Sequence, residues 1–146
     1  NEKKLDLNNA ELRTVPKGLL LLCSSIKSLE LQNNKLGELP DTIGALAALQ
    51  TLRLSFNQLP RLPAEGLSML TQLQTLQLYD NQLTRLPEGV CQLTQLKHLS
   101  VGVNRLVAVP EQARGGVRSG GVFWCGGDRP PGAGASSMYC FRWAAS

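Results

Sequence analysis

Few side chains in this chain of 146 residues are suited to acid–base or nucleophilic chemistry. There is one histidine, His98, and there are four cysteines: Cys23, Cys91, Cys125 and Cys140. A Ser–His–Asp or Cys–His set needs a base held against a nucleophile and oriented by a third group. The sequence offers His98 no recognisable partner base or nucleophile, so we interpret it as a solvated polar residue. We predict no catalytic residue and no enzymatic activity.

The spacing of the cysteines and glycines does not match the common metal-binding or phosphate-binding motifs. No C-x-x-C pair occurs, although such pairs are typical of cysteine metal sites. The glycine pairs Gly115–Gly116 and Gly120–Gly121 fit neither of the common phosphate-binding patterns. We therefore expect no cofactor and no bound metal.

Charge and hydropathy argue against two classes of partner. The formal net charge is +4, and the segment from Arg114 onward contributes four basic residues and one acidic residue to it. The rest of the chain is almost neutral, so we expect no nucleic-acid surface. No stretch of sequence is long and apolar enough to cross a membrane, so we expect no membrane association.

A block of sequence rich in leucine recurs along the chain, and the fold that it forms determines where the remaining side chains lie. The pattern L-x-x-L-x-L-x-x-N-x-L begins at Ile26, Leu49, Leu73 and Leu96, after a truncated first copy. We call the asparagine position of this pattern the marker position. It holds Ala10 in the first copy and then Asn34, Asn57, Asn81 and Asn104. These markers are spaced 24, 23, 24 and 23 residues apart. A fixed period in this range predicts a solenoid.

Each block continues with a segment that reads Leu-Pro-x-x-Ile-x-x-Leu-x-x-Leu, as it does from Leu39 and, with substitutions, from Leu62 and Leu86. Together the blocks and segments resemble the leucine-rich repeat family over roughly residues 3 to 113. The second segment is similar to that of intracellular leucine-rich repeat proteins that scaffold Ras-type signalling. The resemblance implies an α/β solenoid with short parallel strands on the concave face and short helical or 3₁₀ turns on the convex face. It also implies that the marker asparagines bond to the backbone of neighbouring coils.

The second segment fits the convex side of such a coil. Proline after Leu39, Leu62 and Leu86 cannot donate to a central strand ladder, so it ends the strand side. The apolar residues that follow at every third position predict short helical turns. We expect the extra residue of the 24-residue units to be absorbed there.

Alternation along each strand turns leucines inward and the residues between them to the concave face. Down the central column this gives Asp6, Glu30, Arg53, Gln77 and Ser100. We predict that another protein binds to this face. The candidate contact residues are Glu30, Gln32, Thr51, Arg53, Ser55, Thr75, Gln77, Tyr79, Asp80 and His98.

Phe56 and Tyr79 are the aromatic residues of the repeats, one unit apart and flanked by Arg53 and Asp80. Tyrosine and arginine are enriched among interface hot spots. We favour a surface position for Tyr79. Phe56 has two interpretations, a surface contact or burial beside Asn57, and we favour burial.

The repeat pattern ends after Ala113. We predict two parts: residues 1–113, with about five repeat units, and residues 114–146, a Gly/Pro-rich tail that is irregular or disordered. Eight of the 14 glycines fall in the tail, which is typical of such sequence. A second interpretation is that part of the tail folds back over the last repeat as a crude C-terminal cap. It is suggested by the five aromatic residues of the tail: Phe123, Trp124, Tyr139, Phe141 and Trp143.

The cysteines favour a reducing compartment. Cys23 and Cys91 lie in equivalent segments three units apart, a separation of roughly 14 Å, whereas a disulfide needs Cα atoms within about 7 Å. We expect both to be free, largely buried thiols. Cys125 and Cys140 could pair, but nothing in the sequence requires it. With no N-x-S/T acceptor present, we expect a cytoplasmic location.

These features predict a monomeric, non-catalytic protein-interaction module, and the resemblance implies a scaffold or regulator in intracellular signalling. Three alternatives remain: a ligand-recognition fragment of an immune-type receptor, a substrate-selecting segment of a larger enzyme, and a truncated product without a function of its own. The projected concave face is only about 300 Å², against about 800 Å² per partner in a standard interface. We therefore favour a piece of a longer solenoid.

Overall fold

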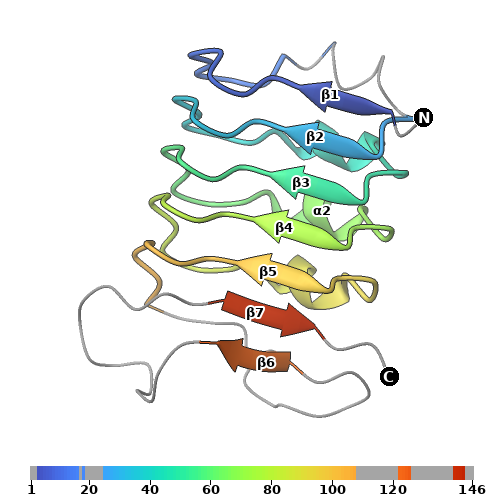
Figure 1. Ribbon diagram of the computed structural model, residues 1–146, viewed down its shortest axis with the longest axis vertical. Helices are drawn as coiled ribbons and strands as arrows, with labels where there is room; N and C mark the ends of the chain where they lie inside the picture. The colour runs from blue at the N-terminus through green and yellow to red at the C-terminus, as the bar shows by residue number, and fades with distance from the viewer. Residues whose placement is uncertain (1–2, 17, 19–24, 108–121, 126–139, 144–146) are drawn as a thin grey trace.

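The computed structural model describes residues 3–16, 18, 25–107, 122–125 and 140–143. Five short parallel strands lie side by side in one open sheet (Figure 1). They are β1 (Lys4–Asp6), β2 (Ser28–Glu30), β3 (Thr51–Arg53), β4 (Thr75–Gln77) and β5 (His98–Ser100). Each strand opens one coil of the repeat, so the predicted α/β solenoid is confirmed.

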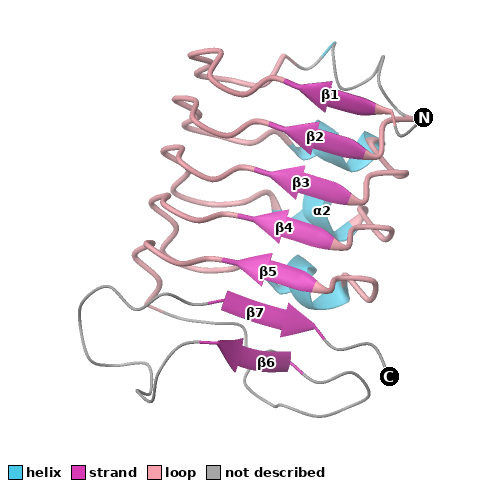
Figure 2. Ribbon diagram, viewed as in Figure 1, coloured by secondary structure: helices cyan, strands magenta, loops and turns pink. Residues whose placement is uncertain are grey.

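Short helices cover the other side of the sheet (Figure 2). They are η1 (Asp41–Ala45) and η2 (Glu88–Gln92), both 3₁₀, and α2 (Ala64–Ser68). Each follows a proline that leaves the chain extended, with φ of −74°, −70° and −70° at Pro40, Pro63 and Pro87. The α-helix lies between Asn57 and Asn81, which are 24 residues apart, and the 3₁₀ helices lie in 23-residue units. An α-helix rises less per residue than a 3₁₀ helix, so it absorbs the extra residue as expected.

The leucines form inward columns that run from coil to coil. Leu29, Leu52 and Leu76 share one column through the strand register, and each has no exposed surface. Four leucines of the first and last coils are only partly buried: Leu5, Leu7, Leu12 and Leu106. Each coil therefore depends on its neighbours to cover its leucines, as in other solenoids.

The marker asparagines join each coil to the one before it. Asn57 Nδ2 donates to the carbonyl oxygens of Leu31 (2.9 Å) and Leu54 (3.0 Å), and its Oδ1 accepts from the N–H of Leu36 (3.1 Å). The same set of bonds recurs at Asn34, Asn81 and Asn104. The structural role that the resemblance implied is confirmed. An asparagine at position 10 would have no described coil before it to bond, which is compatible with Ala10.

On the convex side, glycines allow neighbouring coils to approach closely. A Cβ atom added at Gly66 would lie 2.4 Å from the carbonyl oxygen of Asp41, a backbone atom that cannot swing aside. We expect Gly66→Ala to lower the free energy of unfolding by about 1–3 kcal/mol, as in other overpacked sites. Urea unfolding followed by circular dichroism measures this change. Gly37→Ala is the matched control, because no atom lies within 4 Å of its added Cβ; an equal loss there would refute the steric explanation.

Two strands of the tail extend the sheet. β7 (Cys140–Trp143) pairs antiparallel with β5, and β6 (Val122–Cys125) pairs antiparallel with β7. These eight residues are thus strands within a segment that the sequence led us to expect as irregular. Since β7 occupies the sheet edge that β5 would otherwise expose, the C-terminal cap remains our proposal for the tail.

The cysteines fall in different settings. The register of β6 and β7 places Cys125 opposite Cys140, whereas Cys23 lies outside the described residues. Cys91 is a free, half-buried thiol, so it is less buried than we expected. Burial, and then the nearby charge of Glu88, raise the pKa of the Cys91 thiol. None of the helices in the described ranges has the length and hydropathy that a membrane span requires.

Candidate protein-interaction surface

Two columns of outward side chains cross the strands of the concave face. The parallel register aligns the first as Lys4, Ser28, Thr51, Thr75 and His98. It aligns the second as Asp6, Glu30, Arg53, Gln77 and Ser100, the order predicted from the sequence. The face therefore carries charges over β1 to β3 and mostly uncharged polar groups over β4 and β5.

The predicted contact residues differ in how much surface they offer. Asp80 and His98 are exposed. Six others are partly exposed: Gln32, Thr51, Arg53, Thr75, Gln77 and Tyr79. Ser55 is only 4% exposed, so its predicted position on the surface is wrong. The equivalent residues Gln32 and Tyr79 are partly exposed, so alternation still gives the direction here. The Ser55 side chain is shorter than those of Gln32 and Tyr79 in the neighbouring coils, so it offers little surface between them.

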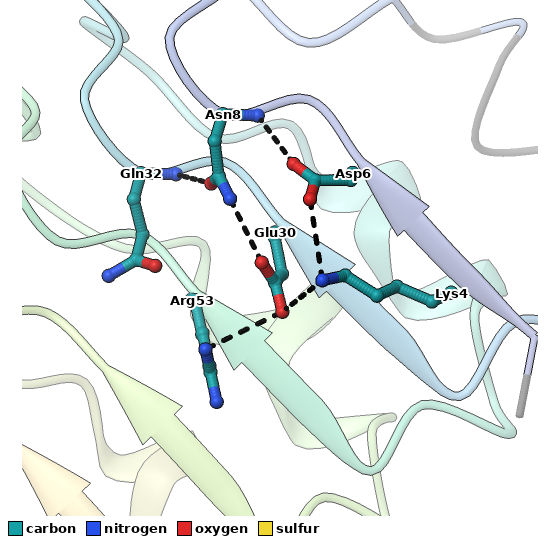
Figure 3. A network of polar contacts seen from close by, with 6 residues as sticks. All are labelled: Lys4, Asp6, Asn8, Glu30, Gln32 and Arg53. Atoms are coloured by element: carbon teal, nitrogen blue, oxygen red, sulfur yellow. Dashed lines mark hydrogen bonds and ion pairs between the residues drawn. The ribbon is translucent and has the colours of Figure 1, made fainter.

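Glu30 is the centre of a polar network that joins the first three coils (Figure 3). Its carboxylate accepts from Asn8 Nδ2 (2.9 Å) and forms ion pairs with Lys4 Nζ (3.0 Å) and Arg53 Nη1 (3.5 Å). Lys4 Nζ also contacts Asp6 at 3.3 Å. These neighbours cover Glu30, which is 8% exposed although it points to the concave side.

The network holds its members in their charged forms. Burial acts to raise the pKa of Glu30, but hydrogen bonds from Lys4 and Asn8 and the charge of Arg53 outweigh it, so the pKa is lowered from the ordinary 4.5. A hydrogen bond to Glu30 is the main reason that the pKa of Lys4 is raised. The backbone N–H of Asn8 is the main reason that the pKa of Asp6 is lowered. Near neutral pH the site is therefore a fixed set of charges.

A pH dependence of stability follows from the lowered pKa of Glu30. Because ionised Glu30 is favoured in the folded state, its contribution is present above the ordinary pKa of 4.5 and is lost as pH falls through the lower folded value. We expect unfolding free energy to fall on acidification below pH 4.5, and Glu30→Gln to reduce this dependence. Urea titrations across that range measure both slopes. Glu65→Gln, on the convex side, serves as the control, and an equal effect there would contradict the assignment.

A hollow of about 430 Å³ lies at the starts of β1 to β3, and we call it the basic hollow. Its lining has three basic side chains, one acidic side chain and three uncharged polar ones: Lys4, Lys27, Arg53, Glu30, Ser28, Gln50 and Thr51. Sequence reasoning missed Lys4 and Lys27. The register that aligned Asp6 with Glu30 also places Lys4 beside Ser28, so the sequence could have identified Lys4. Lys27 lies one residue before β2, outside the positions from which the contact residues were chosen.

The two aromatics form a pair at the rim of the concave face, where the chain leaves β3 and β4. The rings of Phe56 and Tyr79 are 5.5 Å apart between centroids and meet edge to face at 66°. Phe56 is 44% exposed, so the favoured burial beside Asn57 is wrong. Tyr79 is partly exposed, as favoured.

The family assignment rests on the repeats themselves. A leucine rich repeat family profile matches residues 3–59 and 51–106, which together span all five strands of the solenoid. The chain belongs to the leucine-rich repeat family. A similar sequence is the Plant intracellular Ras-group-related LRR protein 7 of Oryza sativa subsp. japonica, 38% identical over 58 residues. That match covers 40% of this chain and 22% of the rice protein.

Solved leucine-rich repeat structures share the fold. A chain of the BIR3–SERK2 complex of Arabidopsis thaliana is 34% identical with a TM-score of 0.66, covering 77% of this chain and 62% of that one. The BIR2 ectodomain from the same plant is 30% identical with a TM-score of 0.66, covering 79% and 62%. YopM of Yersinia pestis is 29% identical with a TM-score of 0.58, covering 75% and 33%. This leucine-rich repeat chain thus spans less than two thirds of each of these relatives.

Family membership and these neighbours, one of which is a complex of two proteins, support a protein-interaction module. The described residues of this repeat protein bring together charges, hydrogen-bond donors and a rigid aromatic pair on one face. Such groups recognise a partner by charge and shape. Within the same residues, no cluster of three or more His, Cys, Asp or Glu side chains is placed to hold a metal ion.

Proposed function

We propose that this leucine-rich repeat chain is a non-catalytic interaction module that binds another protein through its concave face, as a scaffold or regulator in intracellular signalling. The observation that carries the proposal is the concave face itself, where a charge network lies on the sheet and a partly exposed aromatic pair lies at its rim. Rigid elements hold contact groups in place before binding and so reduce the entropy that binding must overcome. Similarity to the rice protein supports the signalling and cytoplasmic parts of the proposal.

A site-specific photo-crosslinker tests which face binds. We would place p-benzoylphenylalanine at Gln77 on the concave face, or at exposed Glu65 on the convex face, in cells that express the protein naturally. The proposal predicts protein adducts from position 77 and none from position 65. Adducts formed only from position 65 would contradict a concave-face function.

Arg53→Ala separates binding from folding on that face. Arg53 makes one ion pair, at 3.5 Å, among the described residues, and Glu30 keeps Lys4 and Asn8 when it is removed. We expect the unfolding free energy to change by less than about 1 kcal/mol, and the adduct yield from position 77 to fall several-fold. Arg61→Ala, exposed outside the concave face, is the matched control. Unchanged adducts in Arg53→Ala would remove Arg53 from the proposed contact set.

Similarity to a chain of the BIR3–SERK2 complex and to the BIR2 ectodomain favours a second candidate, the ligand-recognition part of a receptor. The two candidates differ in compartment. Fractionation of cells that express the protein from its own gene, with a blot for the repeats, distinguishes them. Recovery with the cytosol favours the scaffold, and recovery with the plasma membrane as part of a larger product favours the receptor.

A further inference from the structure

One residue in each coil, directly before the marker position, has a left-handed backbone. The φ values are 55°, 55°, 59°, 53° and 51° at Asn9, Asn33, Phe56, Asp80 and Val103. Asparagine and aspartate adopt this conformation readily, whereas bulky and β-branched residues do so at a cost in energy. The turn therefore suits three of its five residues and strains Phe56 and Val103.

Core packing does not compensate for the strain at Phe56. Its side chain is 44% exposed, and the aromatic contact it makes is the edge-to-face contact with Tyr79. The N–H of Phe56 donates to the carbonyl oxygen of Tyr79 at 2.8 Å, which fixes the two residues relative to each other. Val103 has the same kind of strain and is 41% exposed, so strain alone does not distinguish Phe56. Phe56 differs in having an aromatic partner, and paired aromatics are frequent binding anchors.

The charges beside the pair indicate what kind of partner it fits. Arg53 lies three residues before Phe56 in the same coil, and 40% of its side chain is exposed. Arg53 also lines the basic hollow, where Lys4 and Lys27 add positive charge and Glu30 is the one carboxylate of the lining. Asp6 lies 3.3 Å from Lys4, so three basic groups meet two carboxylates and leave this side with a net positive charge. The surface on this side of the pair is therefore complementary to an acidic segment.

The other side of the pair has the opposite charge. Asp80 directly follows Tyr79 and is exposed, so it disfavours an acidic group over β4. These charges would orient a bound partner. Its acidic residues would lie toward β1 to β3, and its apolar residue would lie over the aromatic pair.

We propose that the Phe56–Tyr79 pair anchors an aromatic or large aliphatic side chain of a protein partner whose adjacent residues are acidic. Arg53 and Phe56 are three residues apart, so their Cα atoms lie at most about 10 Å apart. The acidic and apolar side chains of the partner should therefore lie within about three positions of each other. This inference rests on the proposed function, because it specifies the partner of the concave face.

A random peptide library displayed on phage provides the first test, with the full chain immobilised as bait. The expected result is enrichment of sequences that combine an apolar anchor with Asp or Glu within about three positions. Enrichment of basic sequences, or of apolar sequences without an acidic residue, would overturn the inference. Failure to enrich any sequence would also overturn it.

A synthetic peptide of the enriched sequence then tests the anchor by fluorescence anisotropy. Phe56→Asn should weaken binding at least about tenfold, as expected at a hot spot, while the thermal midpoint stays the same or rises because asparagine accepts the left-handed turn. Val103→Asn relieves the same kind of strain two coils away and should leave the affinity unchanged. Equal binding by wild type and Phe56→Asn would overturn the inference.

The two proposals fail in different ways. If Phe56→Asn binds the peptide normally but Arg53→Ala does not, the concave-face function stands and the aromatic anchor is wrong. If the peptide binds normally to both variants and is lost in Arg61→Ala, neither the anchor nor the concave face is the binding site.

Discussion

Replacement of Leu54 by alanine should lower the free energy of unfolding by about 2–5 kcal/mol. Leu54 has no exposed surface and shares an inward column with Leu31 and Leu78. Protein interiors are close-packed, so a truncated side chain leaves a cavity that neighbouring coils fill only partly. Because each coil of a solenoid is stabilised mainly by its neighbours, this loss at the centre weakens both interfaces of the third coil.

Equilibrium unfolding in urea, followed by far-ultraviolet circular dichroism, measures the loss. Val107→Ala is the matched control, because Val107 is 80% exposed and its truncation leaves no cavity. A loss of less than about 1 kcal/mol in Leu54→Ala, similar to that of the control, would mean that the leucine column does not pack as described.

The solenoid could be predicted from the sequence because the leucine and asparagine positions that specify it recur with a fixed period. The spacing of Asn34, Asn57, Asn81 and Asn104 sets the coil length, and coils of equal length force the strands into register. Even the difference between α2 and the 3₁₀ helices follows from a difference of one residue in unit length.

The surface was harder to predict because alternation gives the direction of a side chain but not how far its neighbours cover it. Each strand of the solenoid has three residues, and the chain then turns through a left-handed residue. Alternation placed Gln32, Ser55 and Tyr79 at equivalent positions, but the short side chain of Ser55 is 4% exposed whereas the other two residues are partly exposed. The resemblance favoured burial of Phe56, which lies in the turn. The positive φ at Phe56 could not be read from its residue type, because phenylalanine rarely adopts it.

The charge network and the tail strands depend on contacts between distant residues. The column order already placed Asp6, Glu30 and Arg53 side by side, but the roles of Lys4 and Asn8 depend on how side chains from adjacent coils meet. Nothing periodic marks β6 or β7, since their pairing uses the exposed edge of β5. Sequence patterns report local repetition, whereas these features arise from non-local packing.

Asn57→Ala should also be strongly destabilising, by about 3–5 kcal/mol. The buried N–H of Leu36 would lose its acceptor, and the carbonyl oxygens of Leu31 and Leu54 would each lose one of two asparagine donors. An unsatisfied buried N–H costs about 1–3 kcal/mol, and each lost hydrogen bond adds about 1 kcal/mol. Urea unfolding measures the total, with Gln58→Ala, an exposed neighbour, as the control.

Asn57→Asp shows whether the donors of the amide matter as well as its acceptor. Aspartate has nearly the same shape and can still accept from the N–H of Leu36, but an ionised carboxylate cannot donate to the carbonyls of Leu31 and Leu54. Burying that charge among carbonyl oxygens raises the pKa of the new side chain, so the loss should grow as pH rises and exceed that of Asn57→Ala at neutral pH. At lower pH the protonated acid can donate one hydrogen bond, and the order of the two variants should reverse. If Asn57→Asp instead remained as stable as the wild type at neutral pH, the acceptor alone would hold the second coil to the third.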